Sequence, residues 1–509
     1  MELYQENRAL CAPQTVLDTV AEQLADVDMT LPDYCPDIEK ILKCSLTPQI
    51  QSRTLSGGQL QVEGSCTVSV LYVDGEKKTI RCCEQSVNFT QHFTVRDVSE
   101  SFVILTKTKP EYINCRALSP RRLSIHGAFS LYAKVIVPKT TRLYMPDDAH
   151  LEVRKEELPC ACLDSLCQDQ FTVSEEVSVA DKSPVEAVLT SAVTACVTDI
   201  KAVTGKLMVS GEISLKLFYL TNVESGETAK MDYILPFSQV IDCVGAQENS
   251  RSVVDCEVLS YDIRLKNDVL SETPLIMLDT KICVTREGFA SRSEQIITDA
   301  YSTDYAVALE RENISVLSDV IPFREHFIEK TTVQIENCRL SGLQDIYADS
   351  VSAQIVAADS GLKAEGKLNL CIIARNEENF PVFIERSCDF SHLIPDTVDC
   401  NEVLFPGVCT GAISYRLADD SSIELRCELT VTGGAVRSET RRAVSNIITD
   451  QDKTLPDDGC ALTLYFAEAG EELWDIAKSH HTQLGLLTAE NELEDGAIDA
   501  PRMLLIPKI

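Results

Sequence analysis

The stretch that decides the fold is LQVEGSCTVSVLY, residues 60–72, in which two kinds of position alternate strictly. One set is mostly apolar and comprises Leu60, Val62, Gly64, Cys66, Val68, Val70 and Tyr72. Alternation of this length is typical of a long strand with one buried face. A glycine within such a strand indicates a bulge or the close approach of another backbone.

The same pattern occurs twice more, at residues 207–219 and 362–374, and glycine again holds the third position as Gly211 and Gly366. A turn follows each copy. About 25 residues after each glycine comes a short block of related sequence: Phe89-Thr90-Gln91, Phe237-Ser238-Gln239 and Phe390-Ser391-His392. We therefore predict three copies of an antiparallel β module of roughly 100 residues, each a small sandwich or meander.

Helix is expected only near the two ends of the chain. Val16, Val20 and Leu24 recur at helical spacing, which predicts an amphipathic helix over residues 15–25. The predicted division is an N-terminal helix and turn-rich segment (1–43), module 1 (44–144), an acidic linker (145–182) and module 2 (183–290). A connector with module 3 (291–435), a second linker (436–459) and a different C-terminal domain (460–509) complete it.

The last fifty residues change in pattern. Leu462, Leu464 and Phe466 alternate as a short strand, and Gly470 precedes a helix whose first turn is acidic. A second helix is expected to end near Asn491, and residues 501–507 form a closing strand. This segment is therefore predicted to be a βααβ domain.

The C-terminal segment resembles a LysM domain. The resemblance rests on Gly470, Leu473-Trp474, Ile476-Ala477, Thr482, Asn491 and Leu504-Leu505-Ile506-Pro507. The usual Gly-Asp-Thr of that family is replaced by Gly470-Glu471-Glu472, and the usual glycine before the last strand is replaced by Pro501.

The three repeats, with the segment Leu31-Pro32-Asp33-Tyr34-Cys35-Pro36-Asp37-Ile38, resemble SPOCS (spore-coat-associated) modules. Such repeats followed by one LysM domain resemble the SpoIVA-interacting protein L (SipL) family of sporulating bacteria. The resemblance implies a non-enzymatic coat-assembly adaptor that acts in the mother-cell cytoplasm at the forespore surface. Its implied partner is the coat ATPase, stage IV sporulation protein A, with other coat proteins as further candidates.

The resemblance places the partner-binding site in a groove between the loops at residues 469–472 and 490–493. The predicted site residues are Leu462, Gly470, Glu471, Glu472, Leu473, Trp474, Asn491 and Leu493. Trp474, the single tryptophan, has two interpretations: a core residue of the first helix, or a partly exposed interface anchor.

Charge narrows the class of partner. The chain has 46 basic and 79 acidic residues, which gives a net charge of −33. Such a surface repels phosphate backbones and anionic lipid, so nucleic acid and membrane surfaces are poor partners. Residues 460–509 contain nine acidic and three basic residues, which favours a basic protein patch. The alternative is binding of peptidoglycan or chitin-type glycan, the general property of LysM domains.

Three other observations bear on chemistry and location. Residues 361–367 read Gly-x-x-x-x-Gly-Lys, but Leu368 stands where a phosphate loop needs Ser or Thr, and the repeat places the segment in a turn and strand. Cys160, Cys162 and Cys167 lack a fourth zinc ligand nearby, so the 21 cysteines are interpreted as reduced structural thiols. No signal peptide, membrane span, cofactor, metal or catalytic site is therefore expected, and a metal or redox enzyme remains the third alternative.

Overall fold

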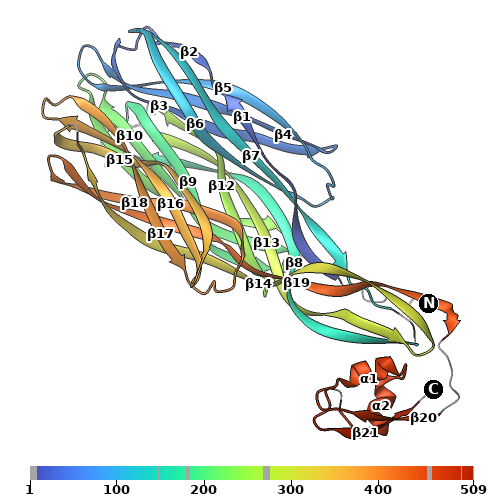
Figure 1. The fold of residues 1–509 in the computed structure, drawn as a ribbon. Coiled ribbons are helices and arrows are strands. Elements are labelled where there is room, and N and C mark those ends of the chain that lie inside the picture. Colours follow the sequence, from blue (N-terminus) through green and yellow to red (C-terminus); the bar gives the residue numbers. More distant parts are fainter. Residues whose placement is uncertain are drawn as a thin grey trace.

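The computed structural model describes residues 9–507 except residues 147, 149, 179–183, 267–274, 337, 455–460 and 495. Strands make up nearly all of its regular structure, and the described helices are two short ones near the C-terminus (Figure 1). We call residues 9–142, 151–302 and 305–454 the first, second and third modules, and residues 461–507 the C-terminal module. The prediction of a mainly β, antiparallel fold is confirmed.

Each of the three modules contains a three-stranded antiparallel meander with the glycine-bearing strand at its centre. In the first module the strands are β3 (Ile38–Ser56), β4 (Gln59–Asp74) and β5 (Ile80–Thr94). In the second they are β9 (Ala187–Val203), β10 (Lys206–Asn222) and β11 (Glu227–Asp242). In the third they are β15 (Leu340–Ala358), β16 (Gly361–Asn376) and β17 (Pro381–Ile394).

A second sheet in each module pairs the last strand with both the first strand and the penultimate one. These sheets are β1 (Ala9–Leu24), β7 (Arg122–Arg142) and β6 (Val103–Ser119), with β2 (Val27–Thr30) also on β7; β8 (Leu151–Ser178), β13 (Leu275–Ser302) and β12 (Arg251–Lys266); and β14 (Tyr305–Gln334), β19 (Ser422–Thr454) and β18 (Glu402–Asp419). In each module the first strand therefore pairs with the last strand, which closes the unit.

The apolar faces of the two sheets meet in the core of each module. In the first module, Leu60 and Val62 of β4 share one buried cluster with Leu131 and Val135 of β7. Equivalent strands supply the cores of the second and third modules. Each module is thus a β sandwich, which is the arrangement that alternating strands with one apolar face require.

The repeated glycine marks the same contact in all three modules. Gly64, Gly211 and Gly366 pair across the meander with Phe89, Phe237 and Phe390. A Cβ atom at any of the three would lie about 2.5 Å from the phenylalanine Cζ and 2.1–2.5 Å from a carbonyl oxygen of the neighbouring strand. The close approach of another backbone, which the sequence predicted as one reason for the glycine, is confirmed, and the ring of the repeated phenylalanine occupies the remaining space.

The helix predicted over residues 15–25 is wrong, because these residues belong to strand β1. The ladder between β1 and β7 shifts register between Thr15 and Leu17, which interrupts the alternation of side chains. Beyond the shift Leu17 and Ala21 pack against the core, whereas Val20 and Leu24 are 52% and 64% exposed. The apolar residues that suggested a helical face therefore lie partly on the solvent side of a strand.

The segments predicted as linkers are also strands. Residues 151–178 of the predicted acidic linker form β8, which pairs with β13 over its whole length. Leu158 and residues 160–163 are all buried, so the period of two that identifies a strand is lost there. Likewise β14 fills much of the predicted connector, and β19 continues to Thr454, well beyond the predicted boundary at residue 435.

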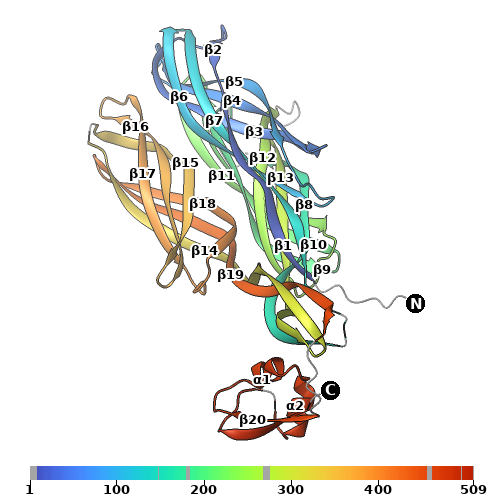
Figure 2. The ribbon, with the colours of Figure 1, turned by 45° about the vertical axis from the view of Figure 1, so that its right-hand side comes forward.

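The long strands β8, β13, β14 and β19 project past the sandwiches of the second and third modules (Figures 1 and 2). Their ends pack on one another through a small core that includes Ile297, Ala300, Val444 and Ile447. The second and third modules are therefore joined by a shared extension, and the C-terminal module lies beside it (Figure 2).

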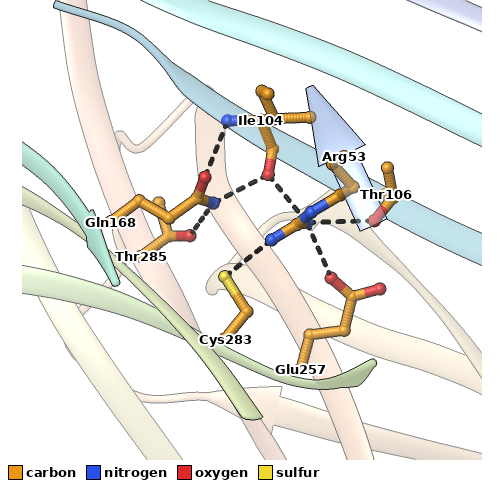
Figure 3. Close-up of polar contacts among 7 residues, drawn as sticks. All are labelled: Arg53, Ile104, Thr106, Gln168, Glu257, Cys283 and Thr285. Atoms are coloured by element: carbon orange, nitrogen blue, oxygen red, sulfur yellow. Dashed lines mark hydrogen bonds and ion pairs between the residues drawn. The ribbon is translucent and has the colours of Figure 1, made fainter. Parts of the chain in front are cut away.

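A buried polar cluster joins the first module to the second (Figure 3). Arg53 of β3 donates to the carbonyl oxygen of Ile104 at 2.9 Å, lies 3.5 Å from the carboxylate of Glu257 on β12 and contacts the sulfur of Cys283 on β13. Burial raises the pKa of Glu257 to about 8, against the opposing effect of Arg53. The arginine thus satisfies groups from both modules and fixes their relative position.

The C-terminal module has the predicted βααβ order: β20 (Leu462–Ala467), α1 (Leu473–Ser479), α2 (Leu484–Glu490) and β21 (Arg502–Pro507). β20 and β21 pair antiparallel. Within the part of the chain that the structure describes, no helix is long and apolar enough to cross a membrane.

Candidate docking site on the C-terminal module

The C-terminal module has its own small core beneath the two-stranded sheet. Leu473, Ile476 and Ala477 of α1 pack with Leu487 of α2. Leu504 and Ile506 of β21 complete this core and are fully buried. The apolar faces of the predicted helices and strands therefore pack against one another. Two of the predicted site residues, Leu473 and Trp474, belong to this core.

The loop before α1 is held by local hydrogen bonds. Gly470 has a φ of +93°, a conformation that favours glycine. The carboxylate of Glu471 accepts hydrogen bonds from the Tyr465 hydroxyl at 3.1 Å and from the backbone N–H of Glu468 at 3.0 Å. Glu472 directs its carboxylate to Arg154 of β8, 2.7 Å away. Two of the predicted site residues thus shape the loop, and the third contacts the second module.

The side chain of Trp474 is only 5% exposed, so the structure agrees with the core interpretation of this residue. Its ring meets that of Tyr301 on β13 edge to face, with centroids 5.1 Å apart. Its indole N–H donates to the Asp299 carboxylate at 3.0 Å. In this arrangement Trp474 joins the C-terminal module to the end of β13 and does not lie on an open surface.

Asp299 is the centre of this joint. Besides Trp474, its carboxylate contacts Lys478 of α1 at 2.5 Å and Arg311 of β14 at 2.9 Å. Burial alone would raise the pKa of Asp299, but the hydrogen bonds from Lys478 and Trp474 outweigh it and lower the pKa. Tyr301 adds a hydrogen bond from its hydroxyl to the Thr482 carbonyl at 2.7 Å. The C-terminal module is therefore attached through specific, partly buried polar contacts as well as through the chain.

The two predicted residues after α2 have structural contacts. Asn491 accepts a hydrogen bond from the backbone N–H of Leu505 at 2.7 Å and donates to the carbonyl oxygens of Leu487 and Leu505. Its side chain thereby connects the end of α2 to β21. Leu493 is partly buried against the core of the module. The structure brings these residues and the Gly470 loop to one module, but not into an open cluster of side chains.

The outer face of the β20–β21 sheet is the most exposed apolar surface of this module. Leu462, Leu464 and Phe466 of β20 are 46%, 64% and 59% exposed, and Met503 of β21 is 56% exposed. Phe466 lies directly opposite Met503 in the ladder, so the two side chains share a face. We call these four residues the outer apolar face.

Sequence reasoning identified one member of this face, Leu462, and missed the others. The signal was present, since the alternation of Leu462, Leu464 and Phe466 predicted a strand. The apolar members of an alternating strand ordinarily face the core. Here Tyr465 and Ala467 pack in the core that the helices share, and Leu462, Leu464 and Phe466 face outward.

The phosphate-loop-like segment and the cysteines, the other candidate sites, have structural roles. Residues 361–367 form the start of β16, directly after the turn at Asp359-Ser360, in agreement with the turn and strand that the repeat predicted, and Gly361 has a φ of +128°. Every cysteine that the structure describes has a free thiol. Among the described residues there is no group of three or more His, Cys, Asp or Glu side chains that could hold a metal ion.

Comparison with known proteins identifies the first two β repeats. A family model described as SipL, SPOCS domain matches residues 37–118 and 184–266. The two ranges hold equivalent strands, β3 to β6 in the first module and β9 to β12 in the second. The third module repeats those strands as β15 to β18, outside the matched residues. No curated protein and no solved structure matches the chain.

Proposed function

Since the chain carries two SPOCS domains of the SipL family, and so is sporulation-related, we propose that it is a non-enzymatic adaptor of spore-coat assembly. In this proposal the C-terminal module, which resembles a LysM domain, binds the coat ATPase, stage IV sporulation protein A, on the mother-cell side of the forespore surface. The observation that carries the proposal is the outer apolar face, on a module attached to the end of a three-module β platform.

The outer apolar face supports a protein partner for an energetic reason. Contiguous exposed apolar residues are uncommon on monomeric proteins and mark interaction surfaces. Full burial of one leucine or phenylalanine side chain contributes about 1.5–3 kcal/mol. Four such residues are enough to anchor a specific complex once a partner covers them.

The charge of the C-terminal module supports a basic partner. Exposed acidic residues of the module include Glu468, Glu490, Glu492, Glu494 and Asp499. Of its basic residues, Lys478 is held by Asp299, and the guanidinium of Arg502 is near the Asn491 carbonyl. A partner with an apolar patch and a basic rim would therefore complement the module, and acidic side chains would repel an anionic cell-wall polymer.

The test is co-purification of the full-length chain with the coat ATPase. Leu464→Glu and Phe466→Glu each place a charge on the outer apolar face, so each should weaken binding by about tenfold or more, which corresponds to about 1.4 kcal/mol. The thermal midpoint should not change, because both side chains are already exposed. Ile234→Glu on β11 is the matched control, since Ile234 is 60% exposed but lies on the second module.

Two outcomes would contradict the proposal. One is unchanged co-purification of both Glu variants. The other is sedimentation of the wild-type chain with insoluble peptidoglycan or chitin, competed by a chitooligosaccharide and unaffected by Leu464→Glu, which would support the glycan-binding alternative. Trp474→Ala is a less specific probe, because loss of its ring also removes core contacts and should lower the thermal midpoint.

A further inference from the structure

Two cysteine thiols meet at the boundary between the second and third modules. Cys196 lies on β9 and Cys409 on β18, more than two hundred residues apart in the chain. Their side chains are within hydrogen-bonding reach of each other. Both are half-buried and line a cavity of about 700 Å³ where the three modules meet. A small reagent therefore has a route to this pair.

The two thiols are chemically unequal. The guanidinium of Arg324 on β14 lies 3.6 Å from the Cys196 sulfur. The hydrogen bond from Cys409 lowers the pKa of Cys196, burial opposes this, and the positive charge of Arg324 adds to the lowering. The pKa of Cys409 is raised, chiefly by the same hydrogen bond and by burial. Because the Arg324 guanidinium lies against the Cys196 sulfur, Cys196 is the nucleophile of the pair and Cys409 is the thiol that reacts second.

The other close thiols differ in position. Cys44 with Cys115, and Cys167 with Cys243, each join segments of a single module. Cys160 and Cys162 lie two residues apart on one strand, with their sulfurs 3.6 Å apart. Cys11 of the first module lies near Cys162 of the second, whereas Cys196 and Cys409 connect the second module to the third.

We propose that Cys196 and Cys409 are an oxidation site at which a low-molecular-weight disulfide closes a cross-link between the second and third modules. The Cys196 thiolate attacks one sulfur of the small disulfide, forms a mixed disulfide and releases one small thiolate. The Cys409 thiol then loses its proton and attacks the Cys196 sulfur, which releases the second small thiolate. Two protein thiols are oxidised, one small disulfide is reduced to two thiols, and the two protein protons pass to the released thiolates.

The cross-link would make the three-module platform responsive to the redox state of its surroundings. In a reducing compartment both thiols stay free and the two modules are held by non-covalent contacts. On oxidation the modules become covalently joined across a segment of more than two hundred residues. The C-terminal module keeps its own attachment, because Trp474 and Asp299 take no part in this chemistry.

The experiment exposes fully reduced full-length protein to glutathione disulfide, blocks the remaining thiols with N-ethylmaleimide and maps the peptides by mass spectrometry. The expected product is a Cys196–Cys409 disulfide, with faster migration in non-reducing electrophoresis that dithiothreitol reverses. Cys409→Ser should stop at a glutathione adduct on Cys196. Arg324→Gln should slow formation of the disulfide by about tenfold, because less Cys196 is ionised. Cys44→Ser is the control and should leave the product and its rate unchanged.

The proposal would be overturned by a map in which Cys196 and Cys409 are both alkylated while other cysteines are oxidised. It would equally be overturned if Cys196 paired with its neighbour Cys256 in place of Cys409. The wild-type map decides the question by itself, so a variant that fails to fold does not weaken the test.

Discussion

At the scale of single residues, one glycine in each central strand makes the sandwich possible. The hydrogen atom at Gly211 leaves room for the Phe237 ring and for the carbonyl oxygen of Cys196. The same pairing at Gly64 and Gly366 explains why the sequence pattern couples a glycine to a phenylalanine that follows about 25 residues later. The phenylalanine covers the exposed backbone at the glycine, which lacks a side chain of its own to pack.

We expect Gly211→Ala to destabilise the chain, because the added methyl group would lie 2.5 Å from both the Phe237 ring and the Cys196 carbonyl oxygen. Overpacking of this kind costs about 1–3 kcal/mol. The measurement is thermal unfolding followed by circular dichroism. Gly485→Ala is the matched control, since it lies in α2 with open space at its Cβ position and should be neutral or slightly stabilising. Equal midpoints for the two variants would show that the contact at Gly211 relaxes freely.

At the scale of elements, the long strand β13 does more than close the second module. Its end reaches past the sandwich and presents Asp299 and Tyr301 to the C-terminal module. Its middle supplies Cys283 to the cluster around Arg53. The second module was predicted to end at residue 290, but its strand β13 continues to Ser302 and contacts all three other modules.

The joint at the end of β13 can be tested with the single tryptophan of the chain. Asp299→Ala removes the acceptor for the Trp474 N–H and the partner of Lys478, and we expect it to weaken the attachment of the C-terminal module by about 1–3 kcal/mol. Trp474 emission should shift to longer wavelength and acrylamide quenching should increase. Asp319→Ala, which removes an ion pair with Arg251 elsewhere, is the control. Identical emission of the two variants would mean that Trp474 is shielded without Asp299.

At the scale of the whole molecule, the three modules meet around a buried carboxyl group. Glu287 of β13 is fully buried, and neither of its carboxylate oxygens has a hydrogen-bond partner. Burial raises its pKa to about 7, Lys134 of the first module opposes this, and Glu402 of the third module adds to it. The packing of the modules is therefore linked to the protonation of this group.

The linkage predicts a pH dependence. The pKa of Glu287 is higher in the folded chain than in the unfolded chain, where it is about 4.3. The contribution of protonated Glu287 to folding stability is therefore complete below about pH 4.3 and is lost as the pH rises to about 7. The loss is on the order of 3 kcal/mol. Glu287→Gln should therefore gain stability relative to the wild type between pH 4 and 8, measured as the difference in thermal midpoint. Glu227→Gln, an exposed control on β11, should show a constant difference. Parallel curves for Glu287→Gln would contradict the linkage.

The candidate docking site was partly predictable. Local patterns located the C-terminal module, its helices and its loop at Gly470. They did not locate the outer apolar face beyond Leu462, and they left the burial of Trp474 as one of two interpretations. Both depend on which residues cover a side chain. Trp474 is covered by Tyr301 and Asp299, which lie some 175 residues away in the chain.

The sequence by itself determined that the chain has three copies of one β module and a different βααβ end, because alternation, glycine placement and turns are local properties that repetition makes visible. Only the tertiary structure decided that residues 9–24 and 151–178 are strands, since register shifts and burial on both faces erase the period of two. It also decided which surfaces stay exposed and which distant groups meet, as at Cys196 with Cys409. Contacts between distant segments leave no periodic trace in a single sequence, and they exist only once the modules pack.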